Sequence, residues 1–235
     1  MRPIDRGQVP QSSAVEVFRP KKYQEFRGFL ITRLGSYCSY CERPISHNVA
    51  VEHIKPKDSN KLLEKEWSNL LLACTNCNST KGDTKIILAA YIWPDIDNSS
   101  LAFIYSSSGR ISINSNISQV NRYRALKTIK LVGLDKEPSY DPAKNGDIKD
   151  QRWRERRTTW NVAQRSFDRL RRNDTEDFRE QIVDTALGRG YFSIWMSVFV
   201  NDSNMLNRFV KAFIGTAKDC YDCNYNLISR PTGRL

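Results

Sequence analysis

Residues 38–83 read CSYCERPISHNVAVEHIKPKDSNKLLEKEWSNLLLACTNCNSTKGD, and this stretch decides what the chain can form. A Cys-x-x-Cys pair lies at each end of it: Cys38, Cys41, Cys74 and Cys77. Two such pairs, around a segment too short to bury its own core, predict one tetrahedral zinc site with four thiolate ligands. Between the pairs lie Glu52 and His53, and His53 is one of only two histidines in the protein. We therefore expect the chemistry to centre on His53.

The chain has 235 residues, more than one zinc module needs, so a larger scaffold should accompany the module. No apolar run approaches the roughly 18 residues of a membrane span. Residues 1–23 contain no apolar stretch typical of a signal peptide. We expect a soluble, cytoplasmic protein. Because that compartment is reducing, thiolate ligands are favoured over the alternative of disulfides for the four cysteines.

The net charge is +11, and much of the excess lies in residues 149–172, KDQRWRERRTTWNVAQRSFDRLRR, with nine Lys or Arg against three acids. Such a concentration of positive charge favours binding of a polyanion, and nucleic acid is the obvious one. The alternative is a helix with a solvated charged face. The side chains expected to contact phosphate are Arg152, Arg154, Arg156 and Arg157, joined by Lys81 beside the second cysteine pair.

Apolar spacing predicts an α+β fold in three regions. Residues 1–20 form an extended arm, residues 21–95 the zinc-clamped module, and residues 96–235 a hairpin and a mostly helical region for substrate and partner binding. Within the module we expect the following elements: a helix over 21–34 that stops at Gly35, a strand at VAVEHI (49–54), an apolar run at NLLLA (69–73), and a helix opening at Asn78 or Ser79.

The same sequence patterns predict the elements of the third region, residues 96–235. LAFIY (101–105) and RISIN (110–114) flank the turn-rich SSSG and predict a β-hairpin. YFSIWMSVFV (191–200) is either a buried helix or a strand, since periodicity does not decide so short a run. The remaining expected elements are helices over 117–133, 152–171, 175–187 and 205–214, with a loop over 135–149.

Phosphodiester hydrolysis needs an activated water, a counter-charge for the transition state and help for the departing 3′ oxygen. A neutral imidazole at His53 can accept the proton of water at pH 7. A hard divalent ion, Mg²⁺ or Mn²⁺, can supply the other two, and it prefers oxygen ligands. The nearest oxygen donors are Glu52 and the side-chain carbonyl of Asn78.

The order Glu-His, then Asn69 in WSNL, then CxxCNxxKG resembles the HNH endonuclease motif in its four-cysteine form. The motif covers about a fifth of the chain and is highly specific as a set. The resemblance implies the ββα-metal fold, in which a hairpin and a helix grip one catalytic divalent ion. It further implies His53 as general base, Glu52 and Asn78 as metal ligands, and Asn69 as the residue that ties down the loop through backbone hydrogen bonds. The third letter of the motif is Asn here rather than His, which keeps an oxygen donor.

Adjacent residues on a regular strand point to opposite faces, yet Glu52 and His53 would serve one site. A bend before Pro56 would bring them together. Otherwise Glu52 orients a neighbour or faces solvent.

Four further side chains carry weaker signals. Asp83 is a candidate neighbour of the metal, and His47 is expected at the surface. Cys220 and Cys223 have no partner pair in the sequence, which favours structural or surface cysteines over a second zinc site.

Segments within and beyond the motif are similar to the PtuB family of HNH effectors from Septu-type and retron-associated anti-phage systems: residues 20–42, 50–57, 124–135 and 213–235. This resemblance implies an ABC-type ATPase partner of the PtuA kind that restrains the nuclease. In the retron-associated setting it adds a reverse transcriptase and its DNA–RNA product. Residues 191–200 and 209–223 are then candidate docking surfaces, with ordinary core as the alternative.

The sequence thus predicts a metal-dependent endonuclease that acts as an anti-phage effector, with DNA as the first substrate and tRNA as a further option. A basic helix reads the nucleic-acid backbone, so both substrates stay open. The opposing interpretation is a non-catalytic zinc ribbon or an adaptor that binds nucleic acid, with His53 incidental.

Overall fold

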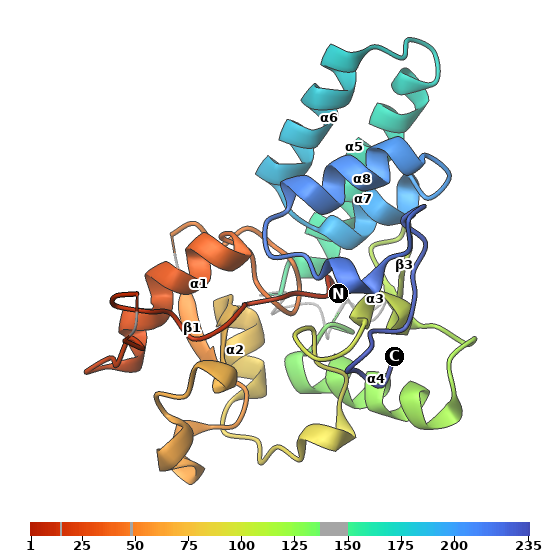
Figure 1. Cartoon of the computed structure of the whole chain (residues 1–235). Coiled ribbons are helices and arrows are strands. Elements are labelled where there is room, and N and C mark those ends of the chain that lie inside the picture. Colours follow the sequence, from red (N-terminus) through yellow and green to blue (C-terminus); the bar gives the residue numbers. More distant parts are fainter. Residues whose placement is uncertain (15, 48, 137–149) are drawn as a thin grey trace.

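Helices surround two small antiparallel sheets in the computed structural model of the chain (Figure 1). The structure describes residues 1–14, 16–47, 49–136 and 150–235. One sheet pairs β1 (Ala50–His53) with β2 (Leu70–Ala73), and the other pairs β3 (Phe103–Tyr105) with β4 (Ile111–Ile113). The predicted α+β class is confirmed.

The segment before the first cysteine pair is helical, as predicted. A 3₁₀ turn at Tyr23–Phe26 leads into α1 (Arg27–Leu34). The helix ends at Gly35, which adopts φ 73° and donates its N–H to the carbonyl of Ile31. Glycine is suited to this end because other residues rarely take a positive φ.

Helix α2 (Thr75–Lys81) begins earlier than the sequence predicted. The sulfur of Cys74 accepts the N–H of Cys77 and caps the first turn, and Gly82 ends the helix. Asn78 therefore lies in the middle of α2 rather than at its start. The short polar residues at 78–79 predict a helix N-cap there, but the N-cap residue of α2 is Cys74.

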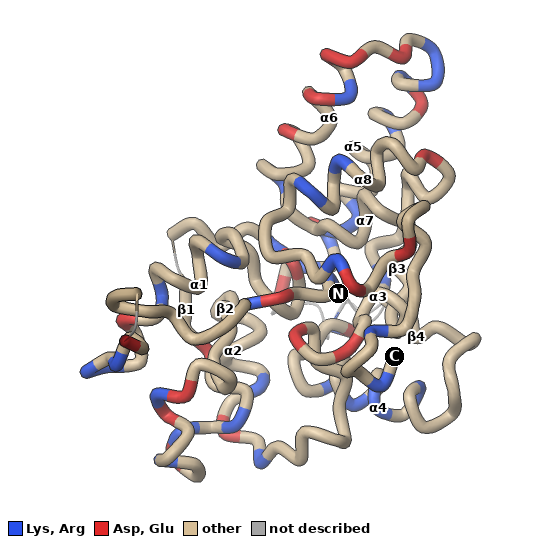
Figure 2. The backbone as a smooth tube through the Cα atoms, in the orientation of Figure 1, with Lys and Arg blue, Asp and Glu red and all other residues tan. Residues whose placement is uncertain are grey.

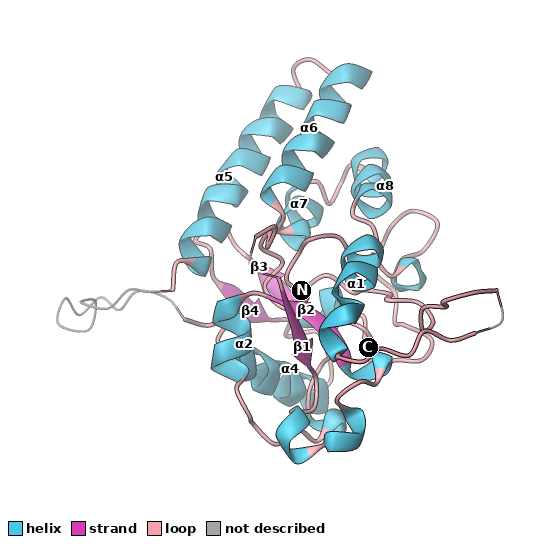
Figure 3. Ribbon diagram, turned by 90° about the vertical axis from the view of Figure 1, so that its left-hand side faces the viewer, coloured by secondary structure: helices cyan, strands magenta, loops and turns pink. Residues whose placement is uncertain are grey.

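The rest of the chain carries the predicted hairpin and helices. The turn α3 (Ser99–Ala102) precedes β3, and α4 (Gln119–Val132) runs from a Ser118 cap to a left-handed Gly133. Four helices follow: α5 (Arg152–Leu170), α6 (Glu176–Arg189), α7 (Phe192–Val198) and α8 (Ser203–Ala212). Helices α5 and α6 form an antiparallel hairpin that projects from the rest of the fold (Figures 1 and 3). Most of the predicted 135–149 loop, residues 137–149, lies outside the described residues.

The apolar run 191–200 forms the buried helix α7, which favours ordinary core over a docking surface. Phe192, Ile194 and Trp195 are each at most 1% exposed. The 209–223 segment also contributes to the core, although Ile214 and Cys223 within it are exposed. Its buried apolar side chains include Phe209, Val210, Phe213, Ala217 and Cys220. Both segments stabilise the helical region by removing apolar surface from water.

The described residues of the arm, 1–14 and 16–20, contain no helix, and the first of them pack into the fold. Residues 1–4 are buried, and Ile4 forms an antiparallel bridge with Thr216. Arg2 donates hydrogen bonds to the carbonyls of Phe213 and Leu34, at 3.1 and 2.7 Å. The first residues of the chain therefore pack against residues 213–216. No helix in the described part of the chain is both long and apolar enough to cross a membrane.

Candidate metal centre and catalytic site

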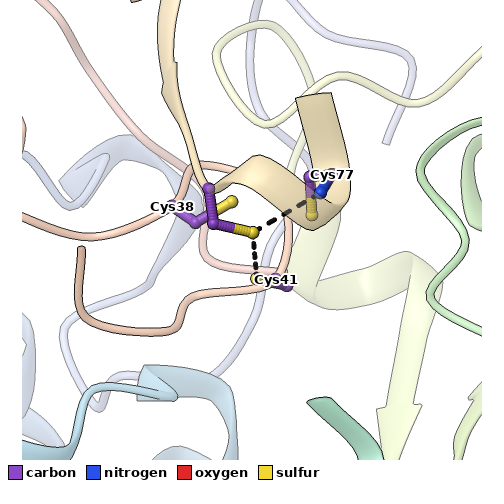
Figure 4. Close-up of side chains that lie close together, drawn as sticks. Cys38, Cys41 and Cys77 are labelled. Atoms are coloured by element: carbon purple, nitrogen blue, oxygen red, sulfur yellow. Dashed lines mark hydrogen bonds between the residues drawn. The ribbon is translucent and has the colours of Figure 1, made fainter. Parts of the chain in front are cut away.

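Four buried cysteine sulfurs converge on one point. Cys38 and Cys41 come from the turn after α1, and Cys74 and Cys77 come from the start of α2. Figure 4 shows Cys38, Cys41 and Cys77 close together. The four Sγ atoms lie within 4.8 Å of one another, and Cys41 Sγ is 3.6 Å from Cys74 Sγ. Sulfurs bonded tetrahedrally to zinc at about 2.3 Å would lie roughly 3.8 Å apart. The donor set and its spacing therefore fit a structural zinc ion.

The electrostatics of the cluster also favour a bound cation. Burial, together with the neighbouring sulfurs, raises the pKa of the Cys41 and Cys77 thiols. Thiolates this close repel one another unless a cation lies among them, so deprotonation and metal binding occur together. Within the described residues no other group of three metal-binding side chains gathers in this way. Cys220 is buried and Cys223 is exposed, as expected for cysteines without a partner pair.

His53 lies at the end of β1, mostly buried at 9% exposure. Its Nε2 is 2.9 Å from the backbone oxygen of Glu64. A carbonyl only accepts hydrogen bonds, so Nε2 must carry the proton, and in the neutral ring Nδ1 is left as the base. The Tyr23 ring packs edge to face against the imidazole, with 4.5 Å between the ring centroids, and so restricts the orientation of the imidazole. The His53 ring is thus held in one orientation, with Nδ1 as the nitrogen that can accept a proton.

Asn69 pins the loop that positions His53. Its Oδ1 accepts the N–H of Lys55 at 2.8 Å, and its Nδ2 donates to the carbonyls of Lys55 at 3.0 Å and Leu63 at 3.2 Å. Leu63 directly precedes Glu64, whose carbonyl binds His53. The buried amide therefore ties both ends of the 55–63 loop to the start of β2.

Glu52 faces away from the surroundings of His53. Its Oε1 lies 2.6 Å from Lys81 Nζ, in an ion pair whose side chains are 1% and 2% exposed. Its Oε2 accepts a hydrogen bond from Tyr40 at 2.6 Å. The strand pairing is regular through His53, and the chain bends only after it, at Ile54 and Lys55. The expected bend therefore comes too late to turn Glu52 and His53 to one site, and the two neighbours contact different residues. Lys81 Nζ also donates to the His53 carbonyl at 2.6 Å and so links α2 to the backbone of β1.

Glu52 and Asn78, the oxygen donors predicted for a catalytic ion, do not form a vacant ion-binding site together, because Glu52 is already bonded to Lys81 and Tyr40. Asn78 is exposed on α2, whereas Glu52 is buried on β1 and bonded to Lys81 and Tyr40. The Lys81 ammonium already occupies the Oε1 side of Glu52. Asp83 and His47 are exposed. A divalent ion on Glu52 would first require Lys81 to move, because two cations do not share one carboxylate oxygen without repulsion.

Three of the predicted phosphate contacts are wrong, because their charged groups are buried. Lys81, Arg152 and Arg156 are 2%, 1% and 1% exposed. Arg156 instead donates to the carbonyls of Gly109 at 2.7 Å and Leu134 at 3.2 Å. Arg154 and Arg157 are exposed.

The helical periodicity of the sequence could have distinguished the buried Arg152 and Arg156 from the exposed Arg154 and Arg157. Arg152 and Arg156 share a helix face with Ala163 and Leu170, which are both buried. Positions three or four apart along a helix lie on one side, so this face pointed to the core.

Sequence comparison agrees with the geometry. Residues 38–84 match the model of the HNH endonuclease family. A Septu protein PtuB from Bacillus thuringiensis is 35% identical over 74 residues, which cover 30% of this chain and 29% of that protein. The chain thus matches less than a third of this relative's length. Residues 38–84 thus form an HNH endonuclease domain, and part of the chain is similar to a Septu protein PtuB.

Proposed function

We propose that the protein is an endonuclease that hydrolyses phosphodiester bonds, with DNA as the first substrate and tRNA as the second, in anti-phage defence. The observation that carries this proposal is the fixed His53 imidazole, bound at Nε2 by the Glu64 carbonyl within a zinc-clamped HNH domain. The defence role is supported by the similarity to a Septu protein PtuB.

In the proposed mechanism His53 Nδ1 takes a proton from the attacking water. The water oxygen then bonds to phosphorus, the P–O3′ bond breaks, and the 3′ oxygen leaves and takes up a proton. Asn69 acts indirectly, because it fixes the loop whose Glu64 carbonyl sets the imidazole tautomer. A positioned general base of this kind contributes about 10²–10⁴ in rate.

A catalytic Mg²⁺ or Mn²⁺ ion stays part of the proposal, since such an ion neutralises charge on the phosphate. Asn78 offers an exposed oxygen for it, whereas Glu52 would join only after Lys81 releases its carboxylate. No step of the mechanism above is routed through this ion.

We assign substrate binding to the outer face of α5. Exposed arginines follow one another along the helix and the turn after it: Arg154, Arg157, Arg165, Arg169 and Arg172. At about 100° per residue these positions lie on one side of the helix. Figure 2 shows further basic residues at the turn joining α5 to α6, and acidic residues along α6. A row of guanidinium groups suits the regular phosphates of a nucleic-acid backbone.

The partners are proposed from resemblance alone. They are an ABC-type ATPase of the PtuA kind and, in a retron-associated setting, a reverse transcriptase with its DNA–RNA product, all in the cytoplasm. Co-purification of the tagged chain with such an ATPase tests the first of these.

Substrate is tested by incubating the zinc-loaded protein, with and without the ATPase, with end-labelled plasmid, phage DNA and total tRNA. Parallel reactions contain Mg²⁺, Mn²⁺ or EDTA. Cleavage of DNA that EDTA abolishes supports the proposal, and cleavage of tRNA alone redirects it to RNA. Binding without cleavage in every condition would favour the non-catalytic zinc ribbon.

A further inference from the structure

Arg152, the first residue of α5, reaches from the helical region into the zinc centre. Its Nη1 donates to Cys77 Sγ at 3.0 Å and to the Val132 carbonyl at 2.9 Å. Its Nη2 donates to the Gly133 carbonyl at 2.6 Å, and its Nε donates to Asp150 Oδ1 at 2.9 Å. The side chain is only 1% exposed, so all three guanidinium nitrogens are bonded inside the protein.

These contacts place a permanent positive charge on a metal-binding sulfur. Four thiolates around a Zn²⁺ ion leave a net charge of about −2 buried in the protein. A guanidinium stays protonated, and its N–H group both offsets this charge and orients the sulfur lone pairs. Partners of this kind typically change metal affinity by about 10–100-fold.

The position of the guanidinium is fixed by elements outside the cysteine segment. The two carbonyls that hold it belong to the C-terminal end of α4, and Asp150 lies just before α5. One turn further along α5, Glu155 accepts a hydrogen bond at 3.0 Å from Nε of Arg43, two residues after Cys41. The first turn of α5 is thus bonded to Cys77 of the second pair and to Arg43 beside the first pair, while the end of α4 holds Arg152 in place.

We propose that Arg152 is a positioning residue for the Cys77 thiolate, and that zinc retention depends on the docking of α4 and α5 against the cysteine pairs. The helical region is then part of the zinc centre. The inference does not depend on nuclease activity, so it can fail or succeed separately from the proposed function.

Arg156 provides a matched control on the same helix. It is also 1% exposed, and it donates to the carbonyls of Gly109 and Leu134 rather than to a sulfur. Arg152→Met and Arg156→Met therefore remove a buried guanidinium of equal burial, with and without the contact to sulfur. Zinc release from the folded full-length chain is followed with the chromogenic chelator 4-(2-pyridylazo)resorcinol, at a temperature where thermal melts show each variant folded.

We expect Arg152→Met to release zinc about 10–100-fold faster than Arg156→Met. Equal release rates would show that Arg152 is only a packing residue and would overturn the proposal. If Arg152→Met does not fold, Arg152→Lys and Arg156→Lys replace the pair, with Co²⁺ in the zinc site. A shifted sulfur-to-cobalt absorption band in Arg152→Lys alone is then expected, and a band unchanged from wild type together with an unchanged release rate would contradict it.

Discussion

Substituting Lys81 with methionine leaves the Glu52 carboxylate buried with the Tyr40 hydroxyl as its hydrogen-bond partner. Glu52 Oε1 receives no well-aligned hydrogen bond and relies on the ammonium 2.6 Å away. Both side chains are at most 2% exposed, so water cannot replace the lost partner. Removing one member of a buried ion pair costs about 3–5 kcal/mol.

That cost should lower the melting temperature of a chain of this size by about 6–20 °C. Removing both charges in Lys81→Met/Glu52→Gln should cost less than the sum of the two single changes, because no charge is then left unpaired. We expect a coupling of about 1–3 kcal/mol. Lys85→Met is the control, since Lys85 is exposed just beyond α2 and should change stability by no more than about 0.5 kcal/mol.

The assay is urea unfolding of the zinc-loaded variants at fixed free zinc, followed by tryptophan fluorescence. The reasoning is refuted if Lys81→Met is as stable as Lys85→Met. It is equally refuted if the two single changes add without coupling, because the pair would then not act as a unit.

Three further changes test other parts of the structure. Stripping zinc with a strong chelator should unfold the cysteine segment and lower the helical circular dichroism, with recovery on adding zinc back; an unchanged spectrum in metal-free protein would contradict the zinc assignment. Asn69→Ala removes three hydrogen bonds to the loop, so we expect it to lower the free energy of unfolding by about 1–3 kcal/mol and to slow cleavage, and a stable, fully active variant would speak against that role. Arg154→Ala/Arg157→Ala should reduce the slope of log affinity against log salt by about 1.8 in anisotropy titrations with duplex DNA, whereas an unchanged slope would place the nucleic acid elsewhere.

Local patterns in the sequence predicted much of the module. The cysteine spacing indicated the cluster because a Cys-x-x-Cys pair carries its own geometry. Gly35 and Gly133 marked the ends of α1 and α4, since each adopts the positive φ that glycine takes without strain. Such signals lie within a few residues of the feature they specify.

Features set by distant contacts were missed. The basic composition of 149–172 predicts a phosphate contact at Arg152, but the C-terminal end of α4 and Cys77 bury this side chain. Likewise, the sequence predicts Lys81 as a phosphate contact, although α2 packs so that the Lys81 ammonium lies against Glu52 of β1. Neither partner is near in sequence, so composition alone did not reveal the pairing.

The most direct test of the account compares cleavage by wild type, His53→Ala and His47→Ala under zinc-loaded conditions with Mg²⁺ or Mn²⁺. His47 is the other histidine of the chain and is exposed, so it controls for loss of an imidazole. We predict a loss of about 10²–10⁴-fold in cleavage rate for His53→Ala, with zinc content unchanged and the variant still folded at the assay temperature, and no loss for His47→Ala. Full cleavage by a folded His53→Ala variant would contradict the assignment of His53 as the base.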